Sequence, residues 1–222
     1  MSNSNPLVKF ENVQKSYDGE VLVVKDFNLD VAKGEFVTML GPSGSGKTTC
    51  LMMLAGFEPT TNGTIYLKDK PINNVPPHKR GIGMVFQNYA LFPHMTVAEN
   101  LAFPLEVRKM DKSEREAKVN RALDMVQLGE FGNRRPMQLS GGQQQRVAVA
   151  RALASKPKFI LADEPTANLD TSSTSNLLDI MNKLNETEKI TFIFSTHDQR
   201  VIDRARRVVT LEDGKIVNDI KK

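Results

Sequence analysis

Apolar and polar residues alternate near the start of the chain with the period of β-strands. Residues 7–13 alternate as a half-buried strand does, and three more short runs have strand character, at 27–31, 35–40 and 63–68. Ala32-Lys33-Gly34 is a turn signal between two of them. We therefore expect these opening strands to form a small antiparallel sheet.

The pattern changes to a helical period in the middle of the chain, from about residue 94 to 155. Ser113 and Glu116 have the spacing of a capping box. Apolar residues then follow at helical spacing, namely Val119, Ala122, Leu123 and Val126. A second helix is expected to begin at Gly141-Gly142 and to continue through 143–154. This stretch therefore predicts a helical insert.

Strands and helices alternate in the last third, around a short apolar run at 159–162 that is typical of an interior parallel strand. A strand is also expected before the insert, at 82–86. The remaining candidates are a helix marked by Leu177, Leu178, Met181 and Leu184, a strand at 190–194, and a hairpin of 208–211 and 215–217. Strands alternating with helices predict a parallel sheet with crossover connections.

A glycine-rich loop lies between the strand candidate at 35–40 and a helix candidate at 47–55 that Gly56 closes. Its sequence matches G-x-x-x-x-G-K-T and consists of Gly41, Pro42, Ser43, Gly44, Ser45, Gly46, Lys47 and Thr48. Glycines let backbone N–H groups approach phosphate oxygens, and the following helix N-terminus favours anions. We expect Lys47 to reach the β- and γ-phosphates of a nucleotide and the Thr48 hydroxyl to bind Mg²⁺.

Two adjacent acids follow the apolar run at 159–162, which is unusual for a core strand. Pro165 ends the strand, so Asp163 and Glu164 are expected at the carboxyl edge of the sheet, where α/β proteins bind ligands. Beside a phosphate loop, Asp163 would hold Mg²⁺ and Glu164 would polarise the attacking water as a general base.

Composition indicates which kind of protein and which cellular compartment this chemistry belongs to. The 222 residues include 40% hydrophobic and 25% charged residues, as a folded globular chain does. The single Cys50 cannot form an internal disulfide, which fits a reducing compartment. The polar segment Met1–Pro6 is no secretory signal, and no apolar run reaches the roughly 18–20 residues needed to span a bilayer.

A net charge of +4 could favour nucleic acid, anionic lipid or nucleotide. The excess is small and spread out, so we interpret it as a mixed solvated surface and expect no nucleic-acid partner. The densest cluster is interpreted as one exposed helix side and the edge of the next strand; it contains Arg200, Arg204, Arg206 and Arg207.

The segment Leu139-Ser140-Gly141-Gly142-Gln143, continued by Gln144-Gln145-Arg146, resembles the signature of ATP-binding cassette (ABC) ATPases. The resemblance covers about residues 7 to 217. It implies an α/β fold with a P-loop NTPase core and parallel sheet, an N-terminal antiparallel β subdomain and an inserted α-helical subdomain. The single domain 1–222 would then have three parts. Residues from about 1 to 93 would form the antiparallel β subdomain and the phosphate-loop part of the core, about 94–155 the helical signature subdomain, and about 156–222 the rest of the core.

The resemblance also implies roles for residues outside the phosphate loop. Tyr17 lies where the family stacks an aromatic ring on adenine. Gln87 resembles the glutamine that touches Mg²⁺ and the attacking water. Asp170 ends a match to the D-loop at the dimer interface, and His197 resembles the histidine that contacts the γ-phosphate. Thr49 is included among the nucleotide contacts.

In the family, the signature meets the γ-phosphate bound by a second subunit. Ser140, Gly141, Gly142 and Gln143 would thus complete the partner's site, with two ATP molecules held in a head-to-tail dimer. Mg²⁺ and ATP are the implied cofactors, and ATP hydrolysis to ADP and phosphate is the implied activity. Nucleotide-dependent closure can shift an open–closed equilibrium and perform work.

Three other ABC classes are alternatives to a transporter. The stretch between Lys47 and Ser140 is too short for the coiled coil of chromosome-maintenance ATPases, and ribosome-acting members carry two cassettes. A regulatory ATPase on a non-translocating membrane complex stays open. A transporter subunit would lie at the cytoplasmic face of the membrane, with a transmembrane permease and possibly a substrate-capture protein as partners.

The two parts of the chain resemble different transporter groups. Residues 20–155, notably 77–97, are similar to importer ATPases for polyamines, iron or phosphonates. The segments 161–170 and 195–201 look more like the lipoprotein-release and macrolide-efflux group. A short importer ATPase, an unusual efflux member and an engineered chimera all stay open, and an importer is favoured.

Overall fold

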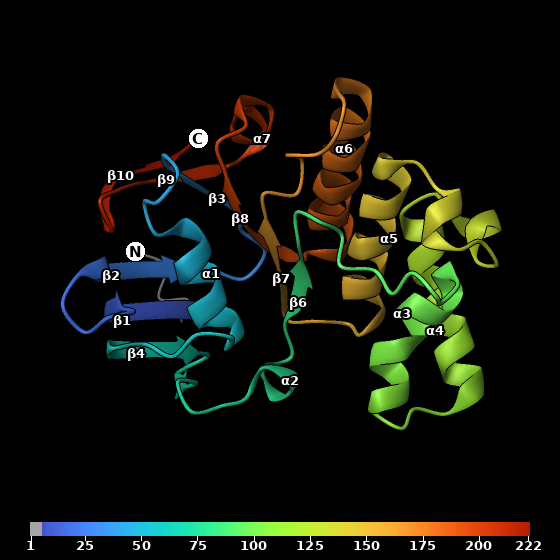
Figure 1. The fold of residues 1–222 in the computed structure, drawn as a ribbon, viewed down its shortest axis with the longest axis horizontal. Coiled ribbons are helices and arrows are strands. Elements are labelled where there is room, and N and C mark those ends of the chain that lie inside the picture. The colour runs from blue at the N-terminus through green and yellow to red at the C-terminus, as the bar shows by residue number, and fades with distance from the viewer. Residues whose placement is uncertain (1–5) are drawn as a thin grey trace.

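The computed structural model describes residues 6–222. Residues 1–5, which belong to the N-terminal segment expected not to be a secretory signal, lie outside the described residues. Figure 1 shows two β-sheets on one side and a group of helices on the other. In the described part of the chain, no helix is long and apolar enough to cross a membrane.

The first sheet is antiparallel, as the alternating pattern predicts. It contains β1 (Val8–Ser16), β2 (Leu22–Val31), β4 (Asn62–Leu67) and β5 (Lys70–Pro71), in the order β2-β1-β4-β5. Every second residue of β1 is buried near its start, including Val8 and Phe10, because one face of this sheet packs on a core. This half-buried geometry explains the period of two in the sequence.

The second sheet has six strands in the order β10-β9-β3-β8-β7-β6. The five strands from β9 to β6 pair in parallel with one another, and β10 forms one edge of the sheet by pairing antiparallel with β9. The strands are β3 (Phe36–Leu40), β6 (Gly83–Val85), β7 (Phe159–Asp163), β8 (Thr191–Thr196), β9 (Arg207–Glu212) and β10 (Lys215–Lys221).

The prediction that placed 35–40 with the opening antiparallel strands is wrong. That segment is β3, which lies inside the parallel sheet between β9 and β8. Its residues are buried on both faces from Phe36 to Met39, as an interior parallel strand requires. The hairpin prediction is confirmed, since Asp213 and Gly214 both adopt left-handed angles between β9 and β10.

Helix α1 (Lys47–Ala55) lies between the two sheets, and its residues Cys50, Leu51 and Leu54 join both in one core. A second core lies on the other face of the parallel sheet. There α6 (Thr171–Glu188) and α7 (Gln199–Arg204) pack, with Leu177 and Val201 buried. The short α2 (Pro77–Arg80) precedes β6.

The predicted helical insert consists of α3 (Val97–Val107), α4 (Lys112–Met125) and α5 (Gly141–Ala154), with 3₁₀ turns at Gly129–Phe131 and Pro136–Gln138. The capping box predicted at Ser113 and Glu116 is wrong. Asp111 caps α4 instead, accepting a hydrogen bond from the Ser113 N–H, because the helix already begins at Lys112.

The topology brings four segments that are distant in sequence to one edge of the parallel sheet. Strands β3, β8, β7 and β6 are successive neighbours and run parallel. Their carboxyl ends therefore lie side by side, followed by the glycine-rich loop, His197, the acid pair and Gln87 respectively. This edge carries the candidate site.

Candidate functional site

The glycine-rich loop connects β3 to α1 and depends on glycine geometry. Gly44 and Gly46 have φ angles of 82° and 97°, which side-chain-bearing residues rarely adopt. A Cβ atom at Gly41 would collide with the Leu211 carbonyl oxygen. No side chain caps the N-terminus of α1, so its first N–H groups are free to face an anion.

Lys47 is the first residue of α1, and its ammonium group turns back into the loop. Its Nζ donates to the carbonyl oxygens of Gly41 and Pro42, at 2.7 and 2.9 Å. Burial lowers the pKa of Lys47, while the charges of Glu164 and Asp163 act in the opposite direction. The ammonium group is thus held in the loop, close enough to Glu164 and Asp163 for their charges to raise its pKa.

A cleft of about 600 Å³ opens above the loop. Most of the predicted loop residues line it, together with the side chains that follow β6, β7 and β8. Gly41 and Ser45, which were also predicted to bind nucleotide, are buried beneath it. The lining consists of Val23, Pro42, Ser43, Gly44, Gly46, Lys47, Thr48, Thr49, Gln87, Glu164, Ala167 and His197.

Asp163 ends β7 and points toward the start of α1. Its Oδ1 accepts hydrogen bonds from the hydroxyls of Thr48, at 2.9 Å, and Ser195, at 2.5 Å. The structure therefore joins two of the three residues that were predicted to bind the metal ion, Thr48 and Asp163, and the third, Gln87, lines the same cleft. In residues 6–222, no group of three or more His, Cys, Asp or Glu side chains is placed to hold a metal ion by itself.

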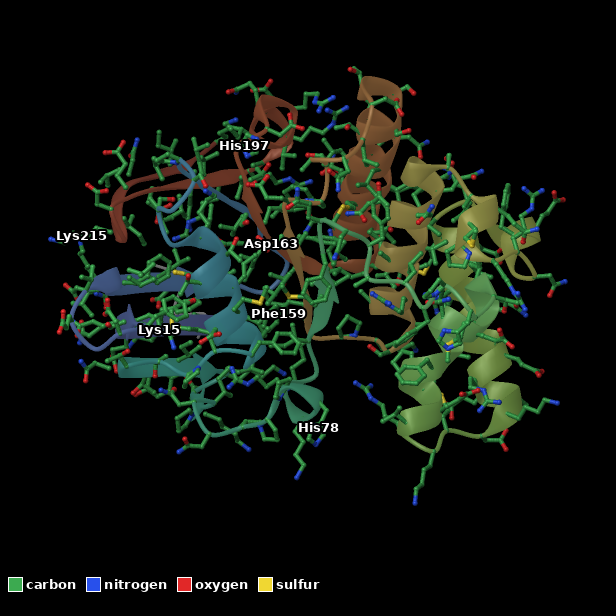
Figure 2. The ribbon with its side chains drawn as sticks, viewed as in Figure 1. Lys15, His78, Phe159, Asp163, His197 and Lys215 are labelled. Carbon is green, nitrogen blue, oxygen red and sulfur yellow. The ribbon has the colours of Figure 1, made fainter. Side chains whose placement is uncertain are left out.

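Glu164 and His197 face each other across neighbouring strand ends. Glu164 Oε1 lies 3.0 Å from His197 Nδ1, and the Glu164 N–H donates to the Ser195 carbonyl at 2.9 Å. Figure 2 labels Asp163 and His197 on these two segments. Glu164 has a φ of 45°, a costly angle for a residue with a side chain, and its Oε2 is buried without a partner among the described residues. Backbone strain beside polar groups is typical of functional positions.

Gln87 follows β6 on the far side of the acid pair and lines the same cleft. The Asn168 amide donates to its backbone carbonyl at 3.1 Å. Its side chain is exposed, so it is free to contact a ligand above Glu164. The cleft thus carries an acid, an amide and an imidazole from three successive strand ends.

Tyr17 lies just beyond β1 at the rim of the loop. The ring is 59% exposed, and its hydroxyl is 3.3 Å from Thr49 Oγ1. The Lys15 ammonium lies 4.7 Å from the ring centroid. The prediction that a flat ligand stacks on Tyr17 is compatible with this exposure and with its closeness to α1.

The signature residues do not belong to this cleft. Ser140 caps α5, accepting from the Gln143 N–H at 3.3 Å while the Gln143 side chain accepts from the Ser140 N–H at 2.9 Å. Ser140, Gly142 and Gln143 line a separate hollow of about 140 Å³ beside Ser173. Asp170, also predicted to bind nucleotide, caps α6 there, and its pKa is lowered chiefly by the hydrogen bond from the Ser173 N–H.

Some residues of the site were not predicted from the sequence. Val23 and Ala167 line the cleft, and the Asn168 amide binds the carbonyl of Gln87. Ser195 was not predicted as a site residue either, yet its hydroxyl donates to Asp163 Oδ1. The small polar Ser195 near the end of β8 is the signal that would indicate this contact, but the pairing of β8 with β7 is not visible from local pattern alone.

A family model described as "ABC transporter" matches residues 24–167. Among curated proteins, the spermidine/putrescine import ATP-binding protein of Haemophilus influenzae is 48% identical over 217 residues, which is 97% of this chain and 58% of that protein. The Fe(3+) ions import ATP-binding protein of Fusobacterium nucleatum is 45% identical over 210 residues, 94% of this chain and 56% of that protein.

The chain thus spans a little over half the length of these curated relatives. Because the alignments include nearly all of this chain, the likeness to importer ATPases extends into the last third, where the sequence had suggested an efflux group.

Two solved structures have the same fold. The ATP-binding cassette MJ0796, solved as a dimer in a post-hydrolysis state bound to ADP and Pi, aligns with a TM-score of 0.86 and 38% identity, covering 96% of this chain and 98% of that one. The protein cbiO1 from Clostridium perfringens, part of the ABC transporter complex cbiONQ, aligns with a TM-score of 0.91 and 27% identity, covering 98% and 89%. The predicted α/β fold with two subdomains added to a parallel core is confirmed.

Proposed function

The chain belongs to the ABC transporter family, and we propose that it binds and hydrolyses ATP to drive solute transport through a separate transmembrane permease. The observation that supports this proposal most strongly is the position of four motifs at the adjacent carboxyl ends of β3, β8, β7 and β6. Lys47, His197, Glu164 and Gln87 converge on one cleft from four adjacent parallel strands. The proteins similar to this chain include importer ATP-binding proteins.

In this proposal the phosphates of ATP lie on the loop, where the free N–H groups at the start of α1 meet them. Lys47 exchanges its carbonyl partners Gly41 and Pro42 for phosphate oxygens. The exposed ring of Tyr17 supports adenine at the rim, next to Thr49. Nucleotide affinity therefore comes mainly from the loop and Tyr17.

Glu164 acts as the general base. It accepts a proton from a water molecule, whose oxygen bonds to the γ-phosphorus as the bond to the bridging oxygen breaks and ADP leaves. His197, 3.0 Å from Glu164, orients the carboxylate and contacts the γ-phosphate. Gln87 contacts the attacking water from the far side of the acid pair.

The donor set at the end of β7 suits Mg²⁺, which prefers oxygen ligands. The Thr48 hydroxyl, the Asp163 carboxylate and the Gln87 amide would hold it, with the remaining positions taken by phosphate and water. Bound there, the ion would neutralise charge on the phosphates. Asp163 is kept in place for this role by the hydrogen bond from Ser195.

Each chain supplies half of each site. The signature around Ser140 lies outside the phosphate cleft of its own chain, yet the N-terminus of α5 is a second place for an anion. In a head-to-tail dimer Ser140, Gly141, Gly142 and Gln143 would meet the γ-phosphate on the partner's loop, and Asp170 would lie at the interface. ATP would then hold the dimer closed until hydrolysis removes the shared phosphate.

The proposed place of work is the cytoplasmic face of the membrane, peripherally on a permease, with import as the direction. Polyamine and iron importer proteins are among those similar to this chain, which supports import over efflux. A substrate-capture protein would complete an importer. Substrate contacts would then lie on the permease and capture protein.

The experiment measures phosphate release by the purified chain with ATP and Mg²⁺, and ATP-driven transport after reconstitution with its co-purifying permease. We expect turnover that Lys47→Ala abolishes. Phosphate release without transport in the presence of a membrane subunit would favour a regulatory complex. No ATP-dependent phosphate release at any chain concentration would contradict the proposed ATPase activity.

A further inference from the structure

The backbone just after Gln87 adopts a costly conformation. Tyr89 and Ala90 have φ angles of 63° and 48°, two consecutive left-handed residues, neither of which is glycine. L-residues adopt this region at a cost, because Cβ crowds the backbone. The backbone bonds within the turn are local, such as the one from the Ala90 N–H to the Asn88 carbonyl at 2.7 Å. Something outside the turn must therefore hold it.

The carbonyl oxygens of this segment accept hydrogen bonds from side chains of other elements. The Arg151 guanidinium, in the last turns of α5, donates to the carbonyl of Ala90 at 2.5 Å and to that of Tyr89 at 3.2 Å. Burial lowers the pKa of Arg151. A planar guanidinium can satisfy both carbonyls at once, which suits it to fix two adjacent peptide groups.

The same segment contacts the other end of α5. A Cβ atom at Gly141, in the signature, would lie 3.0 Å from the Tyr89 hydroxyl, so that hydroxyl packs against the first turn of the helix. Gln145, completely buried between these two contacts, donates to the Pro165 carbonyl next to Glu164 at 2.7 Å. Helix α5 therefore contacts the segment after Gln87 at both ends and the acid turn in between.

We propose that Arg151 is a positioning residue that holds Tyr89 and Ala90 in the left-handed conformation and thereby sets Gln87 in the catalytic cleft. The inference deepens the proposed ATPase function and rests on it. Arg151 contacts neither the phosphate loop nor the acid pair. It acts through the turn, and through Tyr89 it fixes the distance between Gln87 and the signature of its own chain.

The proposal separates turnover from nucleotide affinity. Without Arg151 the turn relaxes to ordinary backbone angles and Gln87 leaves its place, whereas the loop around Lys47 is unchanged. A misplacement of about 1 Å can cost about 100-fold in rate. A glycine at position 90 adopts the left-handed conformation without the steric cost of a Cβ atom. In an Ala90→Gly variant the turn should therefore depend less on the hydrogen bonds from Arg151.

The test compares Arg151→Met, Arg151→Lys, Ala90→Gly and the double variant Arg151→Met/Ala90→Gly in steady-state phosphate release. Arg151→Lys keeps the charge but lacks the planar fork, so it serves where the Met variant is unstable. Arg108→Met is the matched control, since Arg108 donates to the Ser155 carbonyl at the end of α5, away from the turn.

We expect Arg151→Met and Arg151→Lys to lower kcat at least about tenfold with KM for ATP within about twofold of the parent chain. Ala90→Gly should restore most of kcat in the double variant, and Arg108→Met should keep it. The proposal would be overturned if kcat were unchanged in both Arg151 variants, or if ATP affinity fell by the same factor as kcat. It would also be overturned if Ala90→Gly did not restore kcat in the double variant. A parent chain without turnover would instead contradict the ATPase function itself.

Discussion

Glu164 Oε1 lies 3.0 Å from His197 Nδ1, although 159–163 and 191–196 are separate strands with a long helix between them. The contact follows from the parallel register of β7 and β8, which pairs Asp163 with Ser195. The next residues of both strands then emerge at the same edge of the sheet. The left-handed angle of Glu164 turns its side chain toward His197.

Replacing Glu164 with glutamine is expected to abolish turnover while ATP still binds. Glutamine has nearly the same shape but cannot accept the proton from water, and loss of a general base costs about 10²–10⁴-fold in rate. Single-turnover phosphate release measures the chemical step, and equilibrium binding of a fluorescent ATP analogue measures affinity. Near-normal hydrolysis by Glu164→Gln would remove Glu164 as the base.

Replacing Lys47 with alanine is expected to weaken ATP binding itself. The ammonium group is already partly buried in the loop and surrounded by carbonyl oxygens, so its charge is presented directly to phosphate. Isothermal titration with ATP and Mg²⁺ measures the loss. Lys33→Ala, outside the cleft, is the control and should bind as the parent does. Unchanged affinity in Lys47→Ala would contradict the role assigned to the loop.

Asp198 is expected to make stability depend on pH in the acid range. Hydrogen bonds from the Arg200 side chain and the Thr166 hydroxyl lower the pKa of Asp198 to about 2. Because this pKa lies below the unfolded value, the stabilisation is present above about pH 4 and is lost as pH falls toward 2. At neutral pH it amounts to about 2 kcal/mol.

Urea unfolding of the parent chain and Asp198→Asn at several pH values checks this dependence. The difference in free energy of unfolding should shrink between pH 4 and pH 2. Asp179→Asn is the control, because its ion pair with Arg204 is on the surface and such pairs contribute little. A difference between parent and Asp198→Asn that stays constant across this range would exclude the carboxylate as its cause.

Arg80 is expected to stabilise the core behind the phosphate loop. Arg80 is 3% exposed, and its guanidinium donates to the carbonyls of Met53 and Leu54 at the end of α1, both at 2.8 Å, and to that of Val75 at 2.7 Å. Arg80→Met removes the buried donor from these carbonyls, of which only that of Met53 keeps another hydrogen-bond partner among the described residues, the Gly56 N–H. We expect a loss of about 3 kcal/mol in free energy of unfolding.

Chemical denaturation checks the Arg80 prediction, with the exposed neighbour in Lys79→Met as control. The control should change stability by less than about 0.5 kcal/mol. If both variants unfold at the same denaturant concentration as the parent, the buried guanidinium does not stabilise α1.

Local sequence pattern predicted much of this fold, because most elements obey a period set by one buried face. The helix at 141–154 and the strand at 159–163 follow their patterns closely. The assignment of 35–40 to the antiparallel sheet failed because sheet membership depends on pairing between distant segments. The capping box at Ser113 failed because Asp111, two residues earlier, offered a competing acceptor.

In the candidate site, too, residues within short motifs could be predicted from the sequence, whereas contacts between distant segments could not. Motif residues such as Lys47, Asp163 and Glu164 could be predicted as candidates because each motif is confined to a short segment. The contacts of Arg151 with Tyr89 and of Asn168 with Gln87 join segments more than sixty residues apart in sequence. No local pattern indicates such contacts, since they arise where separate segments meet at the carboxyl edge of the parallel sheet.

We propose that each chain supplies one half of two shared ATP sites. Sedimentation of Glu164→Gln with saturating ATP and Mg²⁺, alone and combined with Ser140→Arg in a second variant, measures whether ATP joins two chains. We predict a dimer for Glu164→Gln and a monomer that still binds ATP for the double variant. A Glu164→Gln chain that stays monomeric with ATP bound, or a double variant that dimerises equally well, would show that the two chains do not share their ATP sites.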